Sequence, residues 1–197
     1  MQVVRLQRRA GLFSSVGSGF ESLTPYAWIL WLDLGLGRGV GSGAVDDAEP
    51  EVLLFFLNKM RNAVVRTSEG LTEARLRAPG VASGTNILGL IQHLTGVEEH
   101  WFRVVFLGED LAVEKSMQVP GDVSAADVVA AYRRACAHSD EIVRGSPDLG
   151  TLARAVNPGE PRRAALRRIV AHMIEETGRH AGHADILREQ IDNVTGR

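Results

Sequence analysis

The sequence has a single cysteine, Cys136, among its 197 residues. A lone cysteine excludes an intrachain disulfide and any zinc site built from several thiolates. It lies between two alanines in a segment with helical periodicity, and no basic neighbour stands there to activate its thiol. We therefore interpret Cys136 as a small buried residue. A reducing, cytoplasmic setting fits this low cysteine content.

The sequence also lacks a basic excess and a long apolar run. Its 22 Lys and Arg residues against 24 Asp and Glu give a net charge of -2, which argues against a general nucleic-acid binder. The apolar stretch at residues 27–32 is followed by Asp33 and falls far short of the roughly 20 residues of a membrane span. With 45% apolar and 23% charged residues, we expect one folded domain with room for an appendage, and neither a nucleic-acid nor a membrane partner.

The N-terminal part of the chain differs in composition from the rest. A signal peptide fits poorly there, because glycines and Glu21 separate the first arginines from the apolar stretch and no clean cleavage site follows. The glycine-rich residues 35–44 formally match a dinucleotide-binding fingerprint, but no helix is expected to begin at these glycines, so a flexible linker is the better interpretation. We predict an extension at residues 1–45, either a flexible arm or translated upstream sequence from a misplaced start codon, and a folded domain at residues 46–197.

From Glu49 onward, apolar residues recur at spacings of three and four, which predicts helices. Polar connections with Pro-Gly pairs separate the helical segments, and no strand-like alternation interrupts them. The expected helices run from Glu49 to near Gly70, from Thr85 or Asn86 to Leu107, from Ser124 to Gly145, and from near Pro161 to Asp192. The pattern predicts an all-α fold, a four-helix bundle whose core is a natural place for a metal site.

Potential metal ligands gather on two of these helices. The last helix carries four such side chains on or near one face, at spacings of four, four and three: His172, Glu176, His180 and His183. The second helix adds His93 on an apolar face, where Gly89 and Gly96 are expected to leave space for an ion or ligand. Spacing alone also allows ordinary core histidines and solvated side chains, because polar pairs at i, i+4 are common on helices.

Two segments carry a family resemblance. Residues 86–102 read NILGLIQHLTGVEEHWF, and residues 172–189 read HMIEETGRHAGHADILRE. They resemble the first metal-bearing helix and the last helix of the DinB-like superfamily, and most of all a branch of unknown function related to mycothiol-dependent transferases and isomerases. The resemblance covers about residues 46–197. It implies a four-helix bundle that binds a divalent metal through His93, Glu176 and His180, similar to the His, Glu, His set of mycothiol-dependent maleylpyruvate isomerases.

The chain departs from the commoner family ending His-Arg-Gly-Gln, because it has His180-Ala181-Gly182-His183. His183 is therefore a candidate extra ligand or acid–base group. We interpret His172 and His100 as neighbours of the site or surface residues.

Two histidines and one carboxylate leave an open position on a tetrahedral ion, as in catalytic zinc sites; nickel is the alternative metal. A thiol bound there would become a thiolate near neutral pH. The leading hypothesis is a thiol S-transferase that joins mycothiol, or a similar low-molecular-weight thiol, to an electrophile.

Other roles follow from the same hypothesis and leave alternatives open. His183 and Glu175 are the candidates for proton handling, and Arg103 and Arg179 are candidates for contact with a polar thiol. A metal-dependent hydrolase would use the same ligands, and a non-catalytic metal-binding or stress-response protein is the third possibility. The oligomeric state stays open, although bundles of this family often pair as homodimers.

Overall fold

The computed structural model describes residues 48–195. The predicted extension at residues 1–45 lies outside the described residues, as does its predicted junction with the domain. Among the residues that the structure describes, no helix combines the length and the apolar character needed to cross a membrane.

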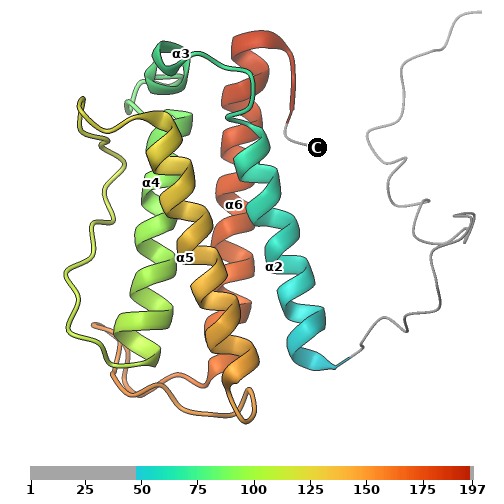
Figure 1. The fold of residues 1–197 in the computed structure, drawn as a ribbon, viewed down its shortest axis with the longest axis vertical. Helices are drawn as coiled ribbons and strands as arrows, with labels where there is room; N and C mark the ends of the chain where they lie inside the picture. Colours follow the sequence, from blue (N-terminus) through green and yellow to red (C-terminus); the bar gives the residue numbers. More distant parts are fainter. Residues whose placement is uncertain (1–47, 196–197) are drawn as a thin grey trace, which may run out of the picture. The chain divides into compact units, whose positions relative to one another are not determined.

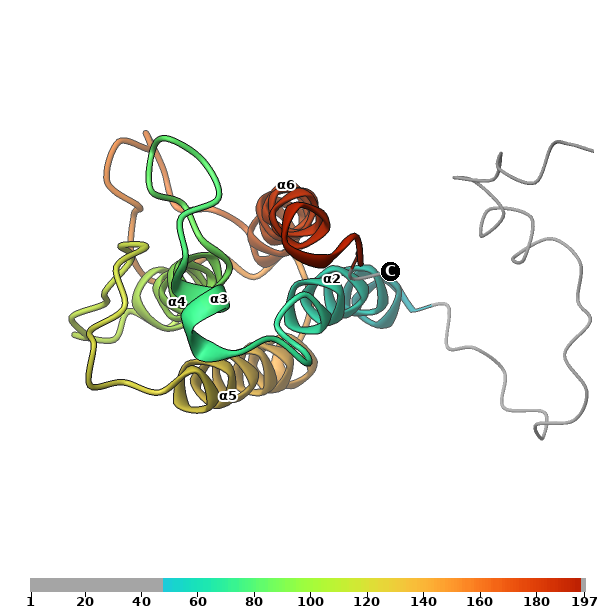
Figure 2. The same cartoon turned by 90° about the horizontal axis from the view of Figure 1, so that it is seen from above.

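Four long helical segments pack side by side as a bundle (Figure 1). They are α2 (Glu49–Arg66), α4 (Ile87–Glu98) with its π-helical continuation η1 (Glu99–Phe106), α5 (Ala125–Gly145) and α6 (Leu166–Asp192). Seen along the bundle axis, they stand at the corners of a square, with the short α3 (Glu73–Arg77) across one end (Figure 2). Helix α2 packs mainly against α6, and α4 packs mainly against α5. Residues 48–195 contain no strand, so the predicted all-α fold is confirmed.

The helix boundaries agree with the predicted ones except at two places. Helix α2 ends at Arg66 rather than near Gly70. Helix α6 begins at Leu166 rather than near Pro161, because the residues before it pair with an earlier segment. Ala153 donates its N–H to the Ala164 carbonyl at 2.8 Å, and Leu166 donates to the Thr151 carbonyl at 2.9 Å. This pairing holds Ala165 in an extended conformation, so the helix begins only at Leu166.

The bundle interior consists of two apolar clusters along the axis. One contains Leu57, Phe102, Ile169 and Met173, and the other contains Leu90, Leu94 and Tyr132. Some residues of the predicted apolar stripes lie outside the core: Val52, Phe56 and Ile186 are exposed.

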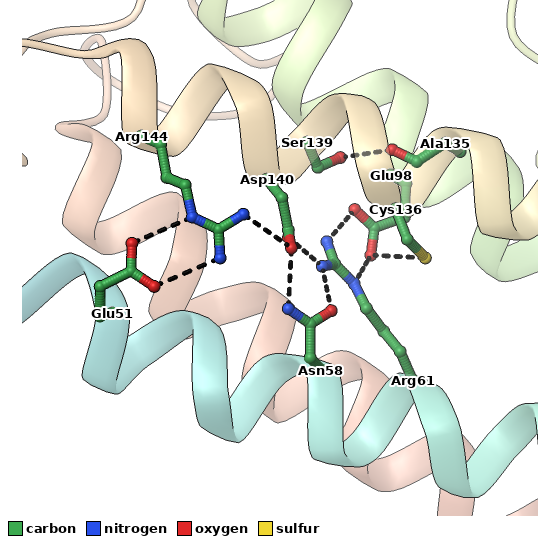
Figure 3. A network of polar contacts seen from close by, with 9 residues as sticks. All are labelled: Glu51, Asn58, Arg61, Glu98, Ala135, Cys136, Ser139, Asp140 and Arg144. Atoms are coloured by element: carbon green, nitrogen blue, oxygen red, sulfur yellow. Dashed lines mark hydrogen bonds and ion pairs between the residues drawn. The ribbon is translucent and has the colours of Figure 1, made fainter. Parts of the chain in front are cut away.

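A buried charge network ties three of the helices together (Figure 3). Arg61 of α2 donates two hydrogen bonds to the Glu98 carboxylate of α4, at 2.7 and 2.6 Å, and one to Asp140 of α5 at 2.6 Å. Burial alone would lower the pKa of Arg61, but the negative charges of Glu98 and Asp140, the Cys136 thiol and the hydrogen bond to Glu98 together outweigh it. The pKa is therefore raised, and the guanidinium stays charged. The Cys136 thiol lies 3.9 Å from a Glu98 oxygen, and burial followed by that negative charge raises its pKa. This agrees with the interpretation of Cys136 as an unactivated residue.

Candidate metal centre

The structure brings His93 of α4 together with Glu176 and His180 of α6. One potential ligand atom from each residue lies within 4.8 Å of the other two. Glu176 Oε1 is 3.1 Å from His180 Nε2 and 3.4 Å from His93 Nε2. Glu176 and His180 are adjacent because they stand one helical turn apart, and both are buried, at 8% and 6% exposure.

The orientation of His93 is fixed from the side away from Glu176. Its Nδ1 lies 2.6 Å from the Lys115 carbonyl oxygen. A carbonyl has no proton to give, so Nδ1 must be the donor. In a neutral imidazole the other nitrogen, Nε2, then carries a lone pair, and that lone pair faces Glu176 Oε1. Two acceptors that face each other repel, and a cation between them would turn this repulsion into attraction. The donor set therefore fits a divalent metal.

Two glycines of α4 let the connection after η1 lie against the helix. A Cβ atom on Gly89 would overlap the Met117 carbonyl, and one on Gly96 would overlap the Glu114 carbonyl. The expectation that these glycines leave room for an ion or ligand is therefore wrong, because backbone fills that room. The close approach instead brings the Lys115 carbonyl within hydrogen-bonding distance of His93.

The remaining ligand residues also have polar partners. His180 Nδ1 lies 3.4 Å from His183 Nδ1, and Arg179 donates a hydrogen bond to Glu176 Oε2. Burial, followed by the electrostatic effect of the neighbouring His93 and Arg179, lowers the pKa of His180 to about 4. His180 is therefore neutral at pH 7, which is the form that binds metals.

The predicted catalytic candidates lie beside these ligands, on the outer side of α6. His183 is exposed and contacts His180 through Nδ1. Glu175 is exposed and pairs with His172 at 3.6 Å and with Arg179 at 4.0 Å.

Arg103 lies elsewhere, in a hollow between η1 and α5, where it pairs with Glu109 at 2.7 Å and with Glu99 at 3.5 Å. Of the two arginines proposed to meet a thiol, only Arg179 lies at the candidate metal centre.

A cavity of about 400 Å³ opens directly beside His93 and Glu176. Its other lining residues come from α4, η1, α6 and two connections: Val97, His100, Trp101, Lys115, Asn157, Pro158 and His172. Burial lowers the pKa of both His100 and His172, so both rings are neutral near pH 7.

Sequence reasoning missed Trp101, Lys115 and Asn157 as cavity residues. A signal existed for Trp101, which follows His93 by two helical turns. Lys115 and Asn157 lie in connections without periodicity.

Comparison with known proteins identifies the family of this chain. The family model described as mycothiol-S-transferase matches residues 52–193. That range contains all the described helices apart from the first three residues of α2. No curated protein matches the chain.

Proposed function

This chain belongs to the mycothiol S-transferase family, and on that premise we propose that it joins mycothiol, or a similar low-molecular-weight thiol, to an electrophile. His93, Glu176 and His180 would hold a divalent metal, with zinc the first expectation and nickel the alternative. When bound, such an ion lowers the pKa of a coordinated thiol and so supplies the thiolate nucleophile.

One observation carries the proposal: His93 Nε2 faces a Glu176 oxygen at 3.4 Å, while the Lys115 carbonyl accepts a hydrogen bond from the other ring nitrogen. This is the arrangement of a metal-ligating histidine, whose second nitrogen donates to a carbonyl or carboxylate and so sets its tautomer. Arg179 orients Glu176 in a similar way: it donates a hydrogen bond to Oε2, and Oε1 faces the two imidazoles.

The thiol proton must leave during the transfer. His183 is the better placed of the two predicted proton-handling residues, because it contacts His180 and is exposed. Glu175 is occupied by His172 and Arg179. We therefore assign to His183 the transfer of the thiol proton to solvent.

The cavity favours an enzyme over a purely structural metal centre. Two of the proposed ligands, His93 and Glu176, form part of its wall, so a small molecule in the cavity would touch the centre. A hydrolase would use the same side chains with water in place of the thiol, and dependence of the product on thiol separates the two reactions.

The first experiment is elemental analysis of the full-length, tag-free protein beside a His93→Ala/His180→Ala double variant. We expect near-stoichiometric zinc or nickel in the parent and loss of metal in the double variant. His138→Ala serves as a matched control, because His138 lies in the other hollow, between η1 and α5. Metal-loaded protein is then assayed with mycothiol and an alkyl halide. Metal in neither protein, or product formation that is independent of mycothiol, would refute the proposal.

A further inference from the structure

The π-helix η1 carries two of the side chains that line the cavity beside the candidate metal centre. Its bonding runs from residue i to residue i+5, as in the 3.1 Å bond from the Leu107 N–H to the Phe102 carbonyl. Carbonyls at its end accept from another segment: Val105 accepts from Ala155 at 3.0 Å and Phe106 from Arg154 at 2.9 Å. Pi-helical turns are rare and often occur at functional sites.

The Trp101 indole divides the space next to η1 into two parts. On one side lies the cavity of about 400 Å³ that includes His93 and Glu176. On the other side lies a smaller cavity of about 90 Å³, lined also by Glu160 and Arg168. Trp101 and His172 line both cavities, so these two side chains form the partition.

Edge-to-face contacts hold the partition in place. The Trp101 ring centroid is 4.8 Å from that of His172, at 61°, and 5.7 Å from that of His100, at 78°. His100 is itself anchored, because its Nε2 lies 2.8 Å from Asn157 Oδ1. The indole is therefore a fixed wall and not a free surface side chain.

We propose that Trp101 sets which electrophiles the protein accepts, by packing against their apolar body and by limiting their length. This inference rests on the proposed function. Two further lining residues bear on the chemistry of the electrophile. Lys115 and Asn157 line the cavity, and both side chains carry hydrogen-bond donors, which suit a carbonyl oxygen. The ligand class is thus a compact, carbonyl-bearing electrophile with an apolar or aromatic body.

Removal of the indole joins the two cavities and should admit longer molecules. N-substituted 2-chloroacetamides test this, because they share one reacting carbon and differ only in the N-substituent. The thiol sulfur forms a bond to that carbon, the C–Cl bond breaks, chloride leaves with the electron pair, and the thiol proton passes to solvent.

The experiment compares kcat/KM of the metal-loaded full chain for N-methyl, N-benzyl and N-(4-phenylbenzyl) chloroacetamide with mycothiol. For Trp101→Ala we expect the ratio of the longest to the shortest substrate to rise about tenfold, mainly through a lower KM for the longest. Trp101→Phe keeps an aromatic wall and should stay near the parent. Phe56→Ala, at an exposed site on α2, is the control for a general effect of losing a ring. If Trp101→Ala fails to fold, Trp101→Leu carries the same comparison.

A second readout separates this inference from the proposed function. With Trp28 and Trp31 changed to Phe, Trp101 is the only tryptophan left, and the unreactive N-(4-nitrobenzyl)acetamide should quench its fluorescence saturably. Saturable quenching without any turnover supports the cavity and refutes the transferase. Turnover whose length preference is unchanged by Trp101→Ala, or quenching that never saturates, overturns the role of Trp101 and leaves the transferase standing.

Discussion

Replacing Arg61 by methionine should destabilise the bundle strongly. Arg61 is 2% exposed and Glu98 is 0% exposed, and the two are joined by hydrogen bonds of 2.7 and 2.6 Å. The substitution keeps the apolar stem but leaves the Glu98 carboxylate buried without its cation. Loss of one partner of a buried pair costs about 3–5 kcal/mol. At roughly 2–4 °C per kcal/mol for a domain of this size, Tm should fall by about 6–20 °C.

Two further variants make this prediction specific. Arg61→Met/Glu98→Leu replaces the buried pair by apolar side chains, and most of the lost stability should return, because such replacements are often neutral or stabilising. Arg167→Met removes an ion pair with Glu49 in which both side chains are exposed, and it should cost less than about 1 kcal/mol.

The assay is urea and thermal unfolding of each variant, followed by circular dichroism at pH 7. A Tm for Arg61→Met within about 2 °C of the parent, or a double variant less stable than the single one, would refute the reasoning.

Three other predictions concern the metal centre and the thiol. In Gly96→Ala the new methyl group should displace the loop that carries the Lys115 carbonyl, so metal affinity measured by chelator competition should fall about 10- to 100-fold. Gly182→Ala is the control, because its Cβ would meet open space, and it should bind metal as the parent does. Equal affinities of the two variants would contradict the role of the loop. When metal is present at about 100 times its Kd, addition of EDTA should remove about 2.7 kcal/mol of stability and lower Tm by roughly 5–11 °C. A thermal scan of His93→Ala/His180→Ala should show no such effect of EDTA. Burial, followed by the charge of Glu98, raises the pKa of the Cys136 thiol and keeps it protonated at pH 8. Mass spectrometry should therefore show iodoacetamide labelling at least ~10-fold slower in the native than in the guanidinium-unfolded protein. Equal rates would show an accessible thiolate.

The parts of the fold that depend on helical periodicity could be predicted from the sequence. Glu176 and His180 must share a face because they stand one turn apart on a long helix, and Ser124 caps α5 as its sequence indicates, accepting the Asp127 N–H. Only the family resemblance assigns His93 to the same site as Glu176 and His180, because no local pattern indicates which two helices face each other. The cap of α5, by contrast, could be predicted because Ser124 and the Asp127 N–H lie within one turn of the chain.

The features missed by the sequence depend on contacts between distant segments. The late start of α6 results from pairing between Leu152 and Ala165, which no helix signal near Pro161 reports. The Lys115 carbonyl bonded to His93 belongs to a loop that packs on the bundle, and the π-helical form of η1 has no signature in the apolar spacing. A backbone carbonyl has no sequence signature, so the residue that orients His93 could not be found by its type.

The π-helical form of η1 also bears on how relatives should be aligned. A π-turn holds one more residue between bonded groups than an α-turn does, and each residue of an α-helix advances by about 100° around the axis. A relative that lacks one residue between Glu99 and Phe106 could close this segment with ordinary α-bonds. Its partition residue would then occupy a neighbouring column of an alignment rather than the column of Trp101. To relate substrate preference to sequence in this family, residues should therefore be matched by their position around the helix axis and not by alignment column.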